Sequence, residues 1–477
     1  MRKVYKIILM VISILLIGSI IIGTSYSMWV KTAVQKEKNI VNSSCFDIEF
    51  TESSSINLAS AIPISDEAGL KKKPYTFTLK NTCNMNSKVT IALDVLSTST
   101  MSSSAIKTSL TKGNKSGTPT LLTSLDKKAD VDISGAKEAY ILGTDIIGAN
   151  KSKSYSLYLW MDEAVTIAEA SKSFSSKVVI VNTATEEEPP LTLAEKVAAL
   201  ATTDTTQIAT DDPDNNIRYI GANPNNYVYF NCSDYNNQSD STCEKWRIIG
   251  VFKNMTKEDG SKEDLVKIIR DDSLGNIAWD SNNVNDWSKA SLQTTLNGEY
   301  YNGTYATGAL KNDTTRNAIE SVVWNLGGSS TEADVTASMF YERERGTSVY
   351  SGHAPTWTGK IGLMYPSDYG YATSGGSTTD RATCLAKAIY SWKGSGVSDC
   401  KNNDYLYKSG YHQWTLVSPS SFSSLYVFFV GETGYVNDNS YAKATIGVRP
   451  VTFLKSNILI SEVGNGSSES PFHLKVG

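Results

Sequence analysis

The amino-terminal residues 1–27 differ in character from the rest of the chain. Residues 7–23 form a nearly continuous apolar run, which follows Arg2, Lys3 and Lys6. The run is close to the minimum length of a helix that spans a bilayer. Basic residues before it, and few after it, predict that the bulk of the chain lies outside the cell. We assign residues 1–27 to a cleaved signal peptide or a retained membrane anchor. A cytoplasmic chain that buries this run as a core helix is a third interpretation.

The six cysteines support export, because disulfides form in oxidising compartments. Pairing of sequence neighbours would keep each bridge inside one predicted domain, and each would contribute about 2.5–4 kcal/mol in the chain-entropy model. Zinc is not expected, because the chain has no C-x-x-C and only three histidines. The expected pairs are Cys45 with Cys83, Cys232 with Cys243, and Cys384 with Cys400.

The overall charge excludes one class of partner. The chain has 45 basic and 49 acidic residues, which gives a net charge of −4. A nucleic-acid-binding protein of this size normally shows a basic footprint. We therefore expect no nucleic-acid partner.

Residues 28–183 alternate apolar and polar side chains with a period of two. In 46–50, three apolar residues alternate with two acidic ones, and 75–80 alternates in the same way. Such segments, separated by turns rich in Ser, Asn and Gly, predict an all-β sandwich. Residues 100–130 are expected to be mostly loop. Further strands are expected in 88–96, 154–162 and 173–182.

A change of composition separates this region from the next. The sequence TATEEEPP is acidic and ends in two prolines, which is typical of a linker. A short helix is expected after it, with Thr192 and Glu195 as a capping box. We therefore assign 184–216 to a linker that contains a short helix.

Residues 217–477 predict an α+β domain. Strands are expected at 216–221 and 226–231, followed by a hairpin whose turn contains Asp259 and Gly260. Helices are expected over 286–301, with Ser288 as a possible cap, and over 313–328, with Gly327 after the carboxyl end. The region also contains seven of the nine tryptophans.

One polar turn in this domain could bind a ligand. Asp280, Asn282, Asn283 and Asp286 supply oxygen atoms of the kind that Ca²⁺ prefers, although their spacing is not that of an EF-hand. The flanking indoles of Trp279 and Trp287 are suited to stacking on sugars. The alternative, which we favour, is a polar turn between two core tryptophans, so we expect no cofactor.

The mostly apolar segment 444–456 raises a separate question, because it carries Arg449 next to Pro450. A buried guanidinium is costly unless its donors are satisfied, and its fork can reach several carbonyls or a carboxylate. We expect a structural role for Arg449, with Pro450 at a sheet edge or a bulge.

The motifs CEKWRIIGVF, WSKASLQTTLN, WTLVSPS and GVRP together resemble an uncharacterised bacterial surface domain. This resemblance covers most of residues 217–470 and implies a C-type-lectin-like or formylglycine-enzyme-like fold, with Trp246 in a structural role. Val417 occupies a position where that family often has arginine. Residues 1–60 resemble camelysin- and TasA-type exported biofilm fibre proteins, which are β-sandwiches.

These observations predict an extracellular protein, either secreted or held at the cell membrane through residues 7–23. Its expected function is adhesion or recognition of a carbohydrate, a protein or a host ligand. One alternative is a structural subunit of a biofilm or pilus-like fibre, in which 28–41 adds to a neighbouring sandwich and the protein self-assembles. The other is an enzyme that acts on cell walls or glycans, which we do not expect. The sequence has no G-x-S-x-G, H-E-x-x-H, P-loop or G-x-G-x-x-G motif.

Overall fold

The computed structural model divides the chain into two compact units, 1–190 and 191–477. It describes residues 31–34, 46–50, 56–59, 61–113, 117–166, 169, 171–185, 187, 189–331 and 333–476. The predicted membrane segment 7–23 lies outside these residues. Within them, no helix combines the length and the apolar character that crossing a membrane requires.

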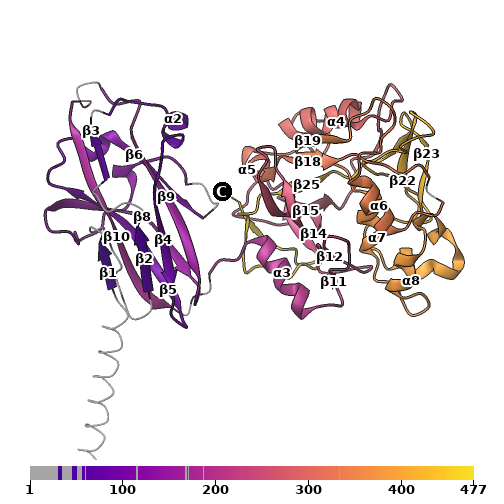
Figure 1. Ribbon diagram of the computed structural model, residues 1–477, viewed down its shortest axis with the longest axis horizontal. Helices are drawn as coiled ribbons and strands as arrows, with labels where there is room; N and C mark the ends of the chain where they lie inside the picture. Colours follow the sequence, from indigo (N-terminus) through magenta and orange to yellow (C-terminus); the bar gives the residue numbers. More distant parts are fainter. Residues whose placement is uncertain are drawn as a thin grey trace, which may run out of the picture. The chain divides into compact units, whose positions relative to one another are not determined.

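The first unit is built from two antiparallel sheets (Figure 1). One sheet has the order β1 (Lys31–Val34), β10 (Ser173–Thr185), β5 (Asn86–Leu96), β8 (Ala136–Ile147), and β3 (Ile56–Ala59) also pairs with β10. The other has the order β2 (Phe46–Phe50), β4 (Tyr75–Asn81), β9 (Ser152–Met161), β6 (Ile106–Lys112), β7 (Thr120–Leu121). A short helix, α2 (Asp66–Leu70), begins at the N-cap residue Ser65.

Alternation in the sequence places one face of each sheet in a shared core. In β4, Phe77 and Leu79 are buried, whereas Lys80 is exposed. Side chains from both sheets, including Val89 and Ile91 of β5, form one hydrophobic cluster. The five strand segments expected in this region are all present, so the prediction of a β-rich sandwich is confirmed.

The prediction that 100–130 is mostly loop missed two strands, because β6 lies beside β9 and β7 beside β6 within the second sheet. Strand β6 was missed because its buried positions include small polar residues. Thr108 and Ser109 are buried, and their hydroxyls donate to backbone carbonyls of Tyr158 and Gly117 at 3.1 and 2.8 Å. Buried hydroxyls that are satisfied in this way are tolerated in a core.

The second unit contains two larger sheets. The first has the order β11 (Ile208–Ala209), β12 (Ile217–Tyr219), β14 (Glu244–Thr256), β15 (Lys262–Arg270), β25 (Val451–Leu454), β17 (Ile319–Glu320), with β13 (Tyr227–Phe230) on β14 and β20 (Ile361–Gly362) on β25. The second has the order β16 (Asn276–Ala278), β24 (Thr445–Gly447), β21 (Gln413–Trp414), β22 (Tyr426–Val430), β23 (Val436–Tyr441). Two strand pairs complete the set: β18 (Val322–Asn325) with β19 (Thr356–Gly359), and β26 (Leu459–Ile460) with β27 (Leu474–Lys475).

Short helices surround these sheets (Figure 1). They are α3 (Leu193–Thr203), α4 (Ser291–Thr295), α5 (Asp313–Asn317), α6 (Ala337–Glu344), α7 (Pro366–Ala372), α8 (Arg381–Ala386) and α9 (Ser398–Asn402). The helix expected after the prolines is α3, and its Thr192–Glu195 capping box is present. However, Leu193 and Val197 are buried in the hydrophobic core of the second unit. This helix is therefore part of that unit rather than of a free linker over 184–216.

The two other helix predictions had different outcomes. Over 286–301, α4 continues into a π-helical turn (Leu296–Tyr300). Asp286, not Ser288, caps the preceding 3₁₀ turn. The helix expected over 313–328 ends with α5, and β17 and β18 follow it. The predicted C′ residue Gly327 therefore follows a strand, because the β-branched and aromatic run Val322–Trp324 favours a strand over a helix.

Candidate functional site

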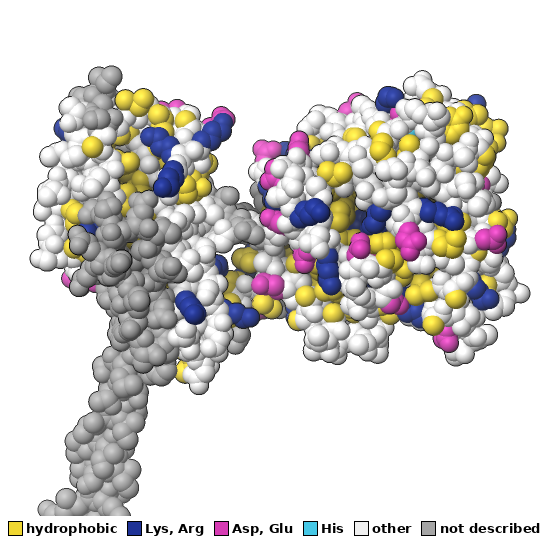
Figure 2. Space-filling model, in the orientation of Figure 1, with side chains coloured by type: hydrophobic (Ala, Val, Ile, Leu, Met, Phe, Trp, Pro, Cys, Tyr) yellow, Lys and Arg dark blue, Asp and Glu magenta, His cyan; other side chains and the backbone are white. Residues whose placement is uncertain are grey.

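Five exposed or half-exposed side chains form an apolar surface on the second unit, which we call the aromatic patch. Phe422 and Tyr441 are 52% and 45% exposed, and Val284 and Leu425 are also exposed. The ring of Tyr426 lies between those of Phe422 and Tyr441, with centroid distances of 5.9 and 4.8 Å. Figure 2 shows hydrophobic side chains gathered on the surface over β22 and β23.

The turn at 280–286 holds this patch together. The Asn285 side-chain amide donates to the carbonyls of Ser423 and Tyr426 at 2.9 and 2.7 Å. Its backbone N–H donates to Ser424 at 2.9 Å. These bonds fix the Ser-rich loop that carries Phe422. The aromatic patch therefore rests on a supported loop.

A small pocket lies on the other side of Asn285. It has room for about one water molecule, with a cavity volume of about 10 Å³. Two of its lining groups, Asn285 Oδ1 and Trp287 Nε1, are buried and have no hydrogen-bond partner among the described residues. Buried polar atoms in native proteins usually have a partner. The pocket thus offers one free acceptor and one free donor. Its lining residues are Trp279, Asn285, Asp286, Trp287, Leu326, Val349, His353, Ala354, Leu416, Val417 and Ser418.

Two titratable groups also line this pocket. Burial alone would raise the pKa of Asp286, but hydrogen bonds from Ser288 and Lys289 lower it below its usual value. Burial lowers the pKa of His353, and the nearby Asp286 carboxylate opposes that shift. Near neutral pH, Asp286 is therefore ionised and His353 is mostly neutral.

The predicted sugar-stacking residues Trp279 and Trp287 lie in the core. They are 0% and 2% exposed, and their ring centroids are 5.1 Å apart. Trp279 Nε1 donates to the carbonyl of Thr415 at 3.1 Å. Neither ring is accessible to stack on a ligand. Trp287 contributes only its indole N–H to the pocket.

Several of the oxygen atoms considered for calcium already accept hydrogen bonds within the protein. Asp280 Oδ2 accepts the backbone N–H groups of Asn282 and Val284, and Oδ1 accepts that of Ser291. Asn283 has a positive φ of 57° and accepts a hydrogen bond from the backbone of Lys443. Among the described residues, no three His, Cys, Asp or Glu side chains are grouped so that they could hold a metal ion. We therefore do not propose calcium at this turn.

Arg449 makes contacts of the expected kind. It is 4% exposed, and its Nε donates to the carbonyl of Arg270 at 2.8 Å. Its Nη1 donates to the Leu406 carbonyl and to Gln413 Oε1 at 3.3 and 3.1 Å. Asp271 lies 3.6 Å from Nη2. The guanidinium therefore ties β15 to the segment that leads into β21.

Pro450 and Trp246 have simpler surroundings. Pro450 is neither at a sheet edge nor at a bulge: it directly precedes β25, which lies between β15 and β17. A proline before the first ladder residue removes no strand hydrogen bond. Trp246 of β14 is 1% exposed and packs edge to face on Phe230 at 5.3 Å.

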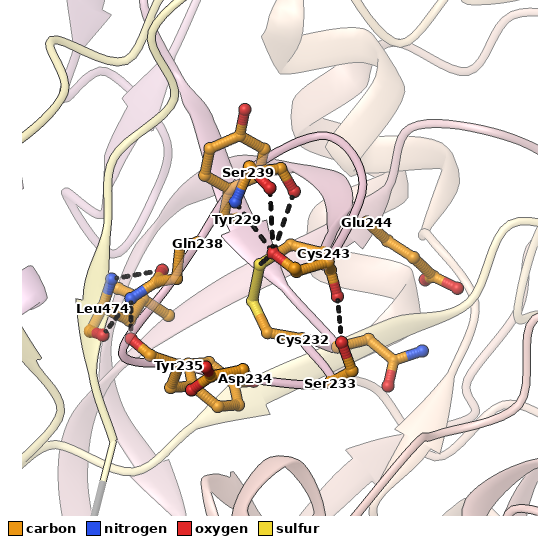
Figure 3. Close-up of a disulfide and its surroundings, with 12 residues drawn as sticks. Tyr229, Cys232, Ser233, Asp234, Tyr235, Gln238, Ser239, Cys243, Glu244 and Leu474 are labelled. Atoms are coloured by element: carbon orange, nitrogen blue, oxygen red, sulfur yellow. Dashed lines mark hydrogen bonds between the residues drawn. A yellow bond between two sulfur atoms is a disulfide. The ribbon is translucent and has the colours of Figure 1, made fainter.

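The Cys232–Cys243 disulfide closes the loop that follows β13 (Figure 3). The Cys243 N–H donates to the Ser239 carbonyl at 2.9 Å. The Gln238 side chain exchanges two hydrogen bonds with the backbone of Leu474, at 2.7 and 3.1 Å. The bridge therefore closes the loop, and the Gln238 hydrogen bonds fasten it to β27.

The remaining cysteines follow the predicted order where they are described. Cys384 and Cys400 form a disulfide. Cys83 is also disulfide-bonded, and its predicted partner Cys45 lies outside the described residues. No described cysteine is free. The two bridges of the second unit confirm those two predicted pairings.

Comparisons with known proteins add little to this description. No family model and no curated protein matches the chain. One solved structure, titled "Structure of infectious bursal disease virus Gt strain", is 7% identical with a TM-score of 0.15. The match covers 34% of this chain and 33% of that chain. A similarity this weak carries no argument about fold or function, so the resemblances stay predictions.

Sequence reasoning missed the aromatic patch. Its signal was present in SPSSFSSLYVFFV, where Phe422 interrupts a Ser-rich loop. Serines lie two positions before and after Phe422, so no alternating strand pattern predicts that its ring is buried. Tyr426 and Tyr441 lie 15 positions apart in the sequence, and only the pairing of β22 with β23 brings them together.

Proposed function

We propose that this chain is an exported recognition protein whose second unit binds carbohydrate through the aromatic patch. The observation that carries the proposal is the exposure of Phe422, Tyr426 and Tyr441 on one supported surface. Aromatic faces pack on the apolar faces of sugars, and polar groups beside them select hydroxyl positions. A C-type-lectin-like fold for the unit is part of the same proposal.

Disulfides support the export of the chain. Two bridges and no free cysteine among the described residues are typical of a protein that folds in an oxidising compartment. The proposal therefore places the second unit outside the cell, secreted or anchored through residues 7–23. The fibre alternative has less support, because β1, which is part of the segment expected to add to a neighbour, pairs with β10 of its own unit.

A glycan array probed with the full chain tests the proposed function. We expect retention on a limited set of glycans. A Tyr441→Ser variant should bind these glycans roughly ten- to thirtyfold more weakly, since one ring face buried on a ligand contributes about 1.5–2 kcal/mol. The matched control is Tyr411→Ser, because Tyr411 is 67% exposed and is not part of the aromatic patch.

The outcomes separate three interpretations. Specific retention that Tyr441→Ser weakens and Tyr411→Ser leaves unchanged supports the proposal. Equal weakening by both variants would contradict it. Turnover of a retained glycan would indicate an enzyme, and no retention on glycans would reject a carbohydrate ligand.

A further inference from the structure

A lysine and an aspartate face each other deep inside the second unit. Lys267 lies on β15 and Asp368 on α7, 101 positions apart in the sequence. Both side chains are 0% exposed, and the Lys267 Nζ is in direct contact with Asp368 Oδ2. Among the described residues, Asp368 is the one hydrogen-bond acceptor of this ammonium group.

Aromatic rings enclose the Lys267 amine. The ring centroids of Tyr365, Phe252, Phe453 and Trp324 lie 4.4, 5.0, 5.5 and 5.7 Å from Nζ. Burying charged groups in such surroundings is costly even when they are paired. A reaction that removes both charges would therefore remove the free-energy cost of burying them.

The neighbouring charges would stay balanced after such a reaction. Arg218 is also buried, and it pairs with Asp212 at 2.6 Å and with Asp368 Oδ1 at 3.1 Å. The cluster thus holds two cations, Arg218 and Lys267, and two carboxylates, Asp212 and Asp368. Loss of one cation and one carboxylate leaves the Arg218–Asp212 pair matched.

We propose that Lys267 and Asp368 condense into an intramolecular amide cross-link. The lysine ammonium first transfers a proton to the Asp368 carboxylate, which gives a neutral amine and a carboxylic acid. Nζ then attacks Cγ, a C–N bond forms and a C–O bond breaks. The leaving oxygen takes a second proton from the nitrogen and departs as one water molecule. The remaining oxygen becomes an amide carbonyl that still accepts a hydrogen bond from Arg218.

Burial would raise the pKa of Asp368, but the neighbouring Lys267 and Arg218 lower it, which opposes the proton transfer. Other features of the surroundings favour the step. Burial lowers the pKa of Lys267 to about 8, against the attraction of Asp368, so the neutral amine is easier to reach. The fold holds the two reacting groups in contact, which replaces a bimolecular encounter. Glu344, another fully buried carboxyl group near Asp368, has a pKa raised by burial to about 7. Below that pH it stays mostly protonated and does not disturb the charge balance.

Such a bond would join β15 to α7 by a link that reducing agents do not cleave. The second unit also holds two disulfides, which reducing agents do cleave. The amide would therefore keep the centre of the unit connected in a reducing environment. This inference does not depend on the ligand of the aromatic patch.

Peptide mapping of the full chain tests the cross-link directly. After reduction, alkylation and trypsin digestion, an unreacted Lys267 permits cleavage between 263–267 and 268–270. A condensed Lys267 blocks that cleavage and joins 263–270 to 361–381, with a mass one water below the sum of the two peptides. We expect the joined product in the unmodified sequence and its loss in Lys267→Arg.

A second pair in the same unit serves as an internal control. Lys408 and Asp271 are 2.9 Å apart but 35% and 17% exposed, so we expect ordinary cleavage after Lys408. Separate peptides 263–267 and 361–381 from the unmodified chain would overturn the proposal, whether or not the variant folds. A condensed Lys408–Asp271 pair would also overturn the argument from burial.

Discussion

Replacing Arg449 by methionine is expected to destabilise the second unit. Methionine keeps much of the apolar stem of the side chain but removes every donor. The Arg270 carbonyl and Gln413 Oε1 then lose the guanidinium as a partner, whereas the Leu406 carbonyl keeps a hydrogen bond from Gln413 Nε2 at 3.2 Å. Leaving two buried acceptors unsatisfied costs about 1–3 kcal/mol each.

Part of that cost is offset because removing the guanidinium relieves repulsion between neighbouring positive charges. Arg449, Arg247 and Lys408 surround the single carboxylate of Asp271, at 3.6, 4.0 and 2.9 Å. Burial lowers the pKa of Arg449 to about 10, so its charge is held at some cost. We therefore expect a net loss of about 2–4 kcal/mol. This corresponds to a fall in melting temperature of roughly 5–15 °C for a unit of this size.

Thermal unfolding of the full chain, followed by tryptophan fluorescence, measures this loss. Only Trp29 and Trp160 of the nine tryptophans lie in the first unit, so the signal reports mainly on the second. The control is Lys253→Met, which changes an exposed lysine on β14. Glycan binding well below the transition should be unchanged. An Arg449→Met chain with the same melting temperature as the wild type would refute a structural role for the guanidinium.

Two further predictions concern pH and the disulfides. The folded-state pKa of Glu344, about 7, exceeds its ordinary value of 4.5, so the stability it contributes is complete below pH 4.5 and is lost as the pH rises to about 7. Glu344→Gln removes this titration, so the unfolding free energy should change less with pH between 4.5 and about 7. The slope that Glu344 contributes is at most about 1.4 kcal/mol per pH unit. Denaturant unfolding that gives the same pH dependence for both proteins would argue against this prediction. Changing both Cys232 and Cys243 to serine should cost about 2.5–3 kcal/mol, because the bridge closes a loop of 11 residues. The midpoint of denaturant unfolding measures this cost, and an unchanged midpoint would contradict it.

Local patterns predicted the local structure well. Alternation in β4 placed Phe77 and Leu79 in the core, and the Thr192–Glu195 pair marked the start of α3. These signals depend on neighbours in the sequence alone. Some failures occurred where tertiary contacts decided the outcome. The buried hydroxyls of β6 are stabilised by partners on other segments, which the sequence does not reveal.

The candidate site was located only approximately. The sequence pointed to the turn at 280–286, which does border the aromatic patch and the pocket. It selected Trp279 and Trp287 because indoles suit sugar binding, but the residue type does not tell whether a ring is buried. Phe422 and Tyr441 became candidates only when the loop and the β22–β23 pairing placed them at the surface.

Hydrogen exchange of the full chain, with and without a glycan retained on the array, tests the central claim most directly. The account predicts that exchange slows in 419–426 and 438–443, which carry the aromatic rings, and stays unchanged in the first unit. Protection of a different surface, with these segments exchanging as in the free protein, would contradict the assignment of the aromatic patch as the binding site.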